Sequence, residues 1–268
     1  MGKGKPFLEV LSSAIHEDYR FPFLELFAFL YALGTFVLAN FTVGIYSQTT
    51  TNEAVAYTVT TSLIGGSLFV FIILVLKNVA YGLGSDLEKG IIQTYFSYPL
   101  RRRGILTAKL LSALGVSLLL FLGIQISALY ILAPDIVLPQ FGTVILTYAA
   151  NLSYPLLISA IMLLMTLILR RGGIALVVGI VLYFAMSIIS GIAFVVALAT
   201  ESPLALQIIS LIAPSYALQY HYGGLSGIFS VTWAPTLSET LLYIGASYVI
   251  VASLFVLGYI YFSRRLNL

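Results

Sequence analysis

The basic residues of this chain fall into a few groups, and a pair of long apolar stretches separates each group from the next. The groups are Lys3, Lys5 and Arg20; Lys77, Lys89, Arg101, Arg102, Arg103 and Lys109; Arg170 and Arg171; and Arg264 and Arg265. The connections between the paired stretches hold Glu53, Asp135, Glu201 and Glu239, and no Lys or Arg. Basic residues that flank membrane spans stay in the cytoplasm. The pattern therefore predicts a multi-pass membrane protein with both termini in the cytoplasm, which we place in the plasma membrane.

Six stretches are long enough to cross a bilayer, because a transmembrane helix needs about 20 mostly apolar residues. The composition agrees, since 60% of the residues are hydrophobic and 9% are charged, against about 25% charged in a soluble domain. We therefore predict an all-α, polytopic membrane protein that forms a single domain over residues 1–268. Its spans are expected at about 23–46, 57–79, 109–133, 143–169, 173–199 and 240–262.

The segment before the first span is expected to be a short interfacial helix. Phe7, Leu8, Leu11 and Ile15 share one face of that helix, and polar residues such as Glu9 and His16 occupy the rest. Pro22 breaks the helix before the first span. Two interpretations remain open: the helix is only a membrane-surface anchor, or it is an elbow that also touches a cytoplasmic partner.

The sequence lacks the residues that several kinds of chemistry require. The middle of each expected span lacks Asp, Glu, Lys, Arg and His, which ion-coupled transporters use to carry protons or hold cations. The chain has no cysteine, and its two histidines, His16 and His221, are expected on opposite sides of the membrane. A phosphate-binding G-x-x-x-x-G-K-[ST] loop is also missing. We expect no metal, no cofactor and no nucleic acid on this chain.

Polar and aromatic side chains within the spans are the candidates for a transport path. The polar ones are Asn40, Gln125, Asn151, Ser153 and Ser190, and such groups more often bond a neighbouring helix. The deeper aromatic ones are Phe69, Phe71, Tyr183 and Phe184. These four are candidates for lining a path, with lipid contact or core packing as the alternative.

The connection between the second and third spans is too elaborate for a simple turn. Leu83, Leu87, Ile91 and Tyr95 recur at helical spacing, which predicts an amphipathic helix over 83–96 at the inner interface. Asp86, Lys89 and Gln93 are expected on its polar face. Gly90 falls inside this helix, where glycine costs about 1 kcal/mol relative to alanine. Close approach of another chain at Gly90 would account for that cost.

The order of residues in this connection resembles the type-2 ABC exporter permeases. An acidic pair, Asp86 and Glu88, precedes Gly90; Ser97, Pro99 and the Arg101–Arg103 run follow, and Ala108-Lys-Leu-Leu111 resembles the start of the family's third span. Ile91 replaces the usual Thr, and Gln93 replaces a second Glu. The outer stretch Ala213–Leu218 is also similar to a Pro- and Tyr-containing stretch of these permeases.

The resemblance implies a membrane subunit that works with separate ATPase chains. Two permease chains, identical or different, would surround a path lined by the second and fifth spans, and two ABC ATPase subunits that bind ATP and Mg would dock beneath. ATPase coupling would fall on Asp86, Glu88, Lys89, Gly90, Gln93 and Tyr95. Short helices would cover the outer end, between the fifth and sixth spans. The cargo would be lipid-like, amphipathic, a drug or a peptide. The alternatives are a secondary transporter or channel, and a non-transporting membrane assembly or immunity protein.

Overall fold

The computed structural model describes residues 5–43, 51–96, 100–225 and 233–264, and within these ranges it contains helices and no strand. Short helices occur at the two ends of the molecule: α1 (Lys5–Asp18), α5 (Ile91–Phe96), α8 (Pro134–Val137), α11 (Leu204–Ile212) and α12 (Ser215–Leu225). The long helices are α2 (Phe23–Val43), α9 (Phe141–Leu169), α10 (Gly172–Thr200), α13 (Leu237–Arg264), and two composite helices.

Each composite helix contains a π-helical turn. α3 (Asn52–Leu76), η1 (Lys77–Gly82) and α4 (Leu83–Glu88) follow one another without a break, as do α6 (Arg102–Leu110), η2 (Leu111–Val116) and α7 (Ser117–Leu132). The first composite helix has 37 residues, which corresponds to a length of about 55 Å. It is therefore longer than a bilayer core of about 30 Å, and α4 extends beyond the apolar part of the bundle.

Five helices are long and apolar enough to cross a membrane within the described residues: Asn52–Glu88, Arg102–Leu132, Phe141–Leu169, Gly172–Thr200 and Leu237–Arg264. A sixth is obtained if α1 and α2, which meet at a bend of 66°, are counted together. The prediction of an all-helical, multi-pass membrane protein is confirmed to this extent. The bend lies next to Pro22, where a proline was expected to end the first helix.

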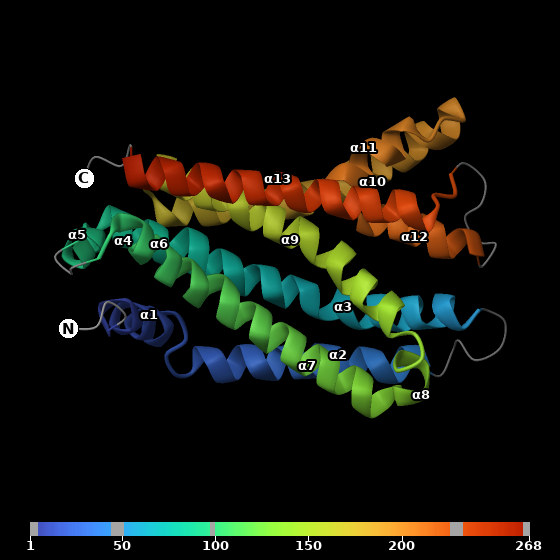
Figure 1. The fold of residues 1–268 in the computed structure, drawn as a ribbon, viewed down its shortest axis with the longest axis horizontal. Coiled ribbons are helices and arrows are strands. Elements are labelled where there is room, and N and C mark those ends of the chain that lie inside the picture. The colour runs from blue at the N-terminus through green and yellow to red at the C-terminus, as the bar shows by residue number, and fades with distance from the viewer. Residues whose placement is uncertain (1–4, 44–50, 97–99, 226–232, 265–268) are drawn as a thin grey trace.

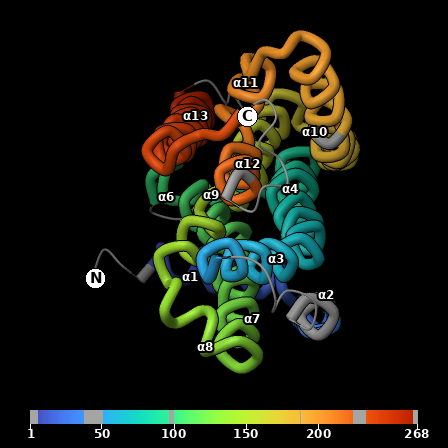
Figure 2. Tube along the Cα trace, turned by 90° about the vertical axis from the view of Figure 1, so that its right-hand side faces the viewer, coloured from blue at the N-terminus to red at the C-terminus, as the bar shows by residue number. Residues whose placement is uncertain are grey.

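The long helices lie side by side with α3 and α9 in the middle (Figures 1 and 2). α2 and α7 pack on α3, and α10 and α13 pack on α9. The two termini lie at the same end of the bundle (Figure 1). That end also contains α1, η1, α4, α5, the start of α6 and the α9–α10 junction. These segments, the turns next to them and the end of α13 carry the described Lys and Arg residues. We call this end of the bundle the basic end.

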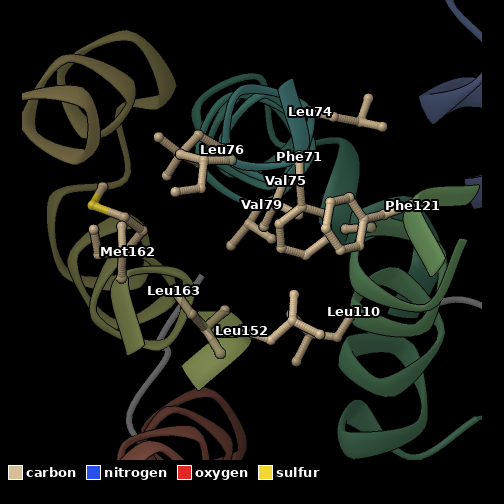
Figure 3. Close-up of a cluster of buried hydrophobic side chains, with 14 of the residues drawn as sticks. Phe71, Leu74, Val75, Leu76, Val79, Leu110, Phe121, Leu152, Met162 and Leu163 are labelled. Carbon is tan, nitrogen blue, oxygen red and sulfur yellow. The ribbon is translucent and has the colours of Figure 1, made fainter. Parts of the chain in front are cut away.

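The core fills the space between α3, α7 and α9. Phe71 and Phe121 are fully buried, with ring centroids 5.3 Å apart, and Met162 and Leu163 of α9 belong to the same buried cluster (Figure 3). Gln125 of α7 lies in the same space, 2.7 Å from Thr35 Oγ1, and its Oε1 accepts a hydrogen bond of 3.1 Å from Tyr148. It also donates to the Leu63 carbonyl of α3 over 3.2 Å, and it thereby links α7 to three other helices, as expected for a polar residue within a span.

Other polar residues of the spans bond locally or across one interface. Ser247 of α13 donates to Ser153 of α9 over 3.1 Å, and Asn151 donates to the Thr147 carbonyl of its own helix over 2.9 Å. Ser190 lies on α10 beside a small outer cavity. The side chain of Asn40 lies outside the described residues.

The expected continuous helix over 83–96 is wrong. Lys89 and Gly90 form a turn between α4 and α5, and Gly90 adopts a left-handed φ of 70°. A side chain strains that conformation, whereas glycine does not. A Cβ atom at Gly90 would meet Gln93 Cδ at 4.0 Å and no nearer atom of the described chain. Gly90 is thus needed for the helix break.

α1 packs on α6 and η2, and Val10 and Ala14 are buried. Leu8, on the face expected to lie at the membrane surface, keeps 62% of its surface exposed. At the other end, α11 and α12 are short helices of 9 and 11 residues. These helices agree with the short helices expected between the fifth and sixth spans; residues 226–232 of that connection lie outside the described residues.

Candidate functional site

The turn between α4 and α5 presents charged and polar side chains to solvent at the basic end. Glu88, Lys89 and Gln93 are exposed. The turn is closed by backbone hydrogen bonds from Gly90 N to Leu87 O (3.4 Å) and from Gln93 N to Gly90 O (3.0 Å). Three of the six residues predicted for ATPase coupling thus face outward together. Ser97 and Pro99, which also carry the resemblance, lie outside the described residues.

Asp86 does not lie on the exposed polar face that was expected for it. Its side chain is buried, and its Oδ2 atom lies 2.8 Å from the Lys109 ammonium of α6. The same ammonium lies 2.7 Å from Glu17 Oε2 of α1 and 5.0 Å from the centroid of the Tyr95 ring of α5. Because α3, η1 and α4 form one helix, the second span, α1, α5 and α6 all meet at Lys109.

A second polar group joins α1 to η2. The Tyr19 hydroxyl lies 3.1 Å from the carbonyl oxygens of Ser112 and Ala113 and 2.9 Å from Ser117 Oγ. A π-helical turn leaves carbonyl groups without their usual partners in the α-helical ladder, and the Tyr19 hydroxyl is placed to donate to them. Burial raises the pKa of Tyr19 to about 12, so its hydroxyl keeps its proton at neutral pH.

Asp18 is buried beside this group. Its Oδ2 atom accepts a hydrogen bond of 2.6 Å from Ser112, and its backbone carbonyl accepts one of 2.6 Å from Lys77. Burial raises the pKa of Asp18 to about 6, and the Ser112 hydrogen bond and the charges of Lys109 and Lys77 oppose that rise. The carboxyl of Asp18 therefore changes charge near pH 6.

Sequence reasoning did not identify the pairing of Glu17, Asp86 and Lys109. A signal was present, because Lys109 stands among apolar residues in Ala108-Lys-Leu-Leu111 and a buried cation needs a carboxylate partner. Several carboxylates, on α1 and on α4, were available, and the sequence does not show which of them face Lys109.

Three of the four candidate path residues come together on one side of the bundle. The rings of Phe69, Tyr183 and Phe184 lie between 5.4 and 6.1 Å from one another, centroid to centroid. Phe69 is 41% exposed and Phe184 is 50% exposed. Phe71 points the other way, into the core, because residues two positions apart lie on nearly opposite sides of a helix. The aromatic group on α3 and α10 therefore has three members.

α10 makes few contacts with the rest of the chain along its outer side. Ile174, Val177, Val181, Ile188 and Ile192 are exposed there, at helical spacing. Near its outer end, a cavity of about 290 Å³ lies between α10, α11 and α12, with Phe194, Gln219 and Tyr220 among its walls.

The described residues contain no group of three His, Asp or Glu side chains placed to hold a metal ion. Comparison with known proteins gives no relative: no protein-family model matches the chain, and no match is found among curated proteins or solved structures.

Proposed function

We propose that this chain is the permease subunit of an ATP-binding-cassette exporter, coupled to separate ATPase chains that bind ATP and Mg. The observation that carries the proposal is the α4–α5 turn. It projects at the basic end from the helix that contains the second span, it exposes Glu88, Lys89 and Gln93, and it coincides with the stretch that resembles these permeases. The basic end would face the cytoplasm of a plasma-membrane protein.

The contacts at Lys109 support a coupling role for this turn. A rigid-body push on α4 or α5 from below would reach α1 and α6 through the ion pairs of Lys109 with Asp86 and Glu17. The buried members of such a cluster hold fixed positions, because separating a buried cation from its carboxylate is costly. In this proposal Glu88, Lys89 and Gln93 contact the ATPase, Asp86 and Tyr95 transmit its movement, and Gly90 shapes the turn.

The cargo path is proposed along α3 and α10, where Phe69, Tyr183 and Phe184 form an exposed aromatic group. A second permease chain would cover the exposed side of α10 and enclose the path. Uncharged aromatic walls favour a lipid-like, amphipathic, drug or peptide cargo over small ions.

The proposal is tested by co-purifying the chain with the ATPase expressed from a neighbouring gene. We expect a stable complex whose ATP hydrolysis is stimulated by cargo. Glu88→Lys reverses a charge at the contact surface and should release the ATPase or abolish the stimulation. Glu201→Lys makes the same charge change at an exposed position at the other end and should have no effect. Wild-type binding and stimulation in the Glu88 variant would refute the coupling role.

Two other functions remain as outcomes of the same experiment. Transport by the purified chain alone in liposomes, without ATP, would assign it to secondary transporters or channels. A clean oligomer that binds no ATPase and moves no solute would assign it to non-transporting membrane assembly or immunity proteins.

A further inference from the structure

A cavity of about 660 Å³ lies at the basic end, between α1, η1, α4 and α5. Arg20, Lys77 and Lys89 contribute cationic side chains to its wall. Within the described part of the chain, Arg20 and Lys89 make no ion pair and no side-chain hydrogen bond. Lys77 donates one hydrogen bond, to the Asp18 carbonyl, and an ammonium group has three donors. The cavity thus has several cationic donors available to a ligand.

The carboxylates in the same wall are engaged by other groups. Glu17 and Asp86 both pair with Lys109, at 2.7 and 2.8 Å, and Asp18 accepts a hydrogen bond from Ser112 at 2.6 Å. Lys109 itself does not line the cavity. The wall therefore holds three cations and three carboxylates, and the carboxylates are engaged with Lys109 and Ser112. Arg20, Lys77 and Lys89 keep donors for an anionic ligand.

The cavity lies at the depth at which the apolar parts of the helices end. Phe23, in its wall, begins α2, and Lys77 follows the apolar run of α3. Tyr81, also in the wall, is 49% exposed, and the neighbouring Phe21 is 81% exposed. Aromatic rings gather at the level of the lipid headgroups, and basic pockets between helices on that side bind lipid phosphates.

We propose that this cavity binds the phosphate group of an anionic phospholipid, with Arg20, Lys77 and Lys89 as the groups that hold it. The Lys77 ammonium already lies 4.6 Å from the centroid of the Phe23 ring, so the phosphate would sit beside an aromatic surface that acyl chains contact. The exposed aromatic rings favour a lipid over a free phosphate ion, because a free phosphate ion has no acyl chain to contact them. The site depends on membrane insertion of the chain and does not depend on an ATPase partner.

The test uses the full chain purified from nanodiscs that contain phosphatidylglycerol or phosphatidylcholine. Native mass spectrometry should show about one retained phosphatidylglycerol per chain and no retained phosphatidylcholine. The double variant Arg20→Gln with Lys89→Gln removes two exposed cations from the cavity and should lower retention by roughly tenfold or more. Arg103→Gln with Arg264→Gln removes two exposed cations from the same end of the bundle, outside the cavity, and should retain the lipid.

Equal loss in both double variants would show general surface attraction and would overturn the proposal. Displacement of the lipid by millimolar inorganic phosphate or glycerol phosphate would assign the cavity to a free phosphate and would also overturn it. A second measurement does not depend on any variant. Short-chain phosphatidylglycerol, but not phosphatidylcholine, should raise the melting temperature of the wild-type chain, and an equal effect of the two lipids would refute the site.

Discussion

At the scale of single residues, the basic end depends on a few buried charged groups. Lys109 is buried and pairs with Asp86, which is also buried, and with Glu17, which is half-exposed. Replacing a buried ion pair by apolar groups is often neutral, but removing one partner leaves an uncompensated charge. The effect on stability of replacing Lys109 therefore depends on whether Asp86 is present, and the reverse also holds. Their positions in the sequence do not indicate this dependence.

Lys109→Met is expected to lower the free energy of unfolding by about 3–5 kcal/mol, because the Asp86 carboxylate loses its partner in a buried site. Thermal unfolding in detergent measures the change. Lys89→Met removes an exposed cation from the same region and should cost no more than about 0.5 kcal/mol. Lys109→Met combined with Asp86→Leu should recover most of the loss, and additive losses in the double variant would contradict the pairing.

Asp18 is expected to make stability depend on pH. Its pKa is about 6 in the folded chain, above the ordinary value of 3.8 that the unfolded chain keeps, so the folded chain binds this proton more tightly than the unfolded chain does. The stabilising contribution of the protonated form is complete below about pH 4 and is lost as the pH rises through about 6. From pH 7.5 to pH 5, the wild type should therefore gain about 1–2 kcal/mol relative to Asp18→Asn, which cannot titrate. Parallel pH profiles of the two melting temperatures would contradict this assignment.

At the scale of helices, two glycines set the geometry of the basic end. A Cβ atom on Gly84 of α4 would lie 2.5 Å from the Cα atom of Gly172, at the start of α10. The two backbones thus touch where the second and fifth membrane helices approach the basic end. Gly90 acts differently, because its surroundings are open and its backbone conformation requires glycine.

Gly84→Ala should destabilise the chain by about 1–3 kcal/mol, because the added methyl group overlaps the backbone of α10 and the two helices must move apart. Gly123→Ala is the matched control on α7, where a Cβ would meet no atom within 4 Å. It should stabilise the chain by about 0.5–1 kcal/mol, since alanine is the better helix former. Equal melting temperatures for the two variants would show that α4 and α10 do not touch.

Gly90→Val and Gly90→Asn should differ in stability by about 1 kcal/mol or more. Asparagine tolerates the left-handed conformation, whereas a β-branched residue does not. The Val variant should therefore straighten or strain the α4–α5 turn, and the Asn variant should melt close to the wild type. If both variants behave alike, residues 83–96 form one helix, as their spacing first suggested. The pair also separates backbone strain from loss of a partner contact in any coupling assay.

At the scale of the whole molecule, the segments that carry the described Lys and Arg residues lie at one end of the bundle (Figure 1). We predict that this end faces the cytoplasm, because basic residues that flank membrane spans stay there. The chain has no cysteine, so single cysteines report their own side of the membrane. Ser238→Cys should react with an impermeant thiol reagent added to intact cells, and Gln93→Cys should react only after the cells are opened. Both positions are exposed, so a lack of access within the protein does not explain a negative result. Labelling of Gln93→Cys from outside would reverse the orientation and remove the basis for a cytoplasmic ATPase at this end.

The sequence by itself predicted six membrane-length stretches, and the described residues contain five of them as single helices and a sixth if α1 and α2 are counted together. Hydrophobic length is a local property, because every backbone group within a bilayer must be satisfied inside its own helix. The grouping of Lys and Arg likewise placed all cations at one end before any contact was known. Phe71 was grouped with Phe69 as a path candidate and is instead buried in the core, although residues two positions apart lie on nearly opposite sides of a helix.

Only the tertiary structure decided which charged groups meet and where the connection between the second and third spans breaks. Glu17, Asp86 and Lys109 come from segments up to 92 residues apart, and their partners depend on how α1, α4 and α6 pack. The apolar positions of 83–96 keep their spacing on both sides of Gly90, so periodicity does not detect the turn, which depends on one left-handed φ angle. Neighbouring helices bury Asp86 and Asp18, and this burial raises the pKa of Asp18. The residues next to each aspartate in the sequence do not predict it.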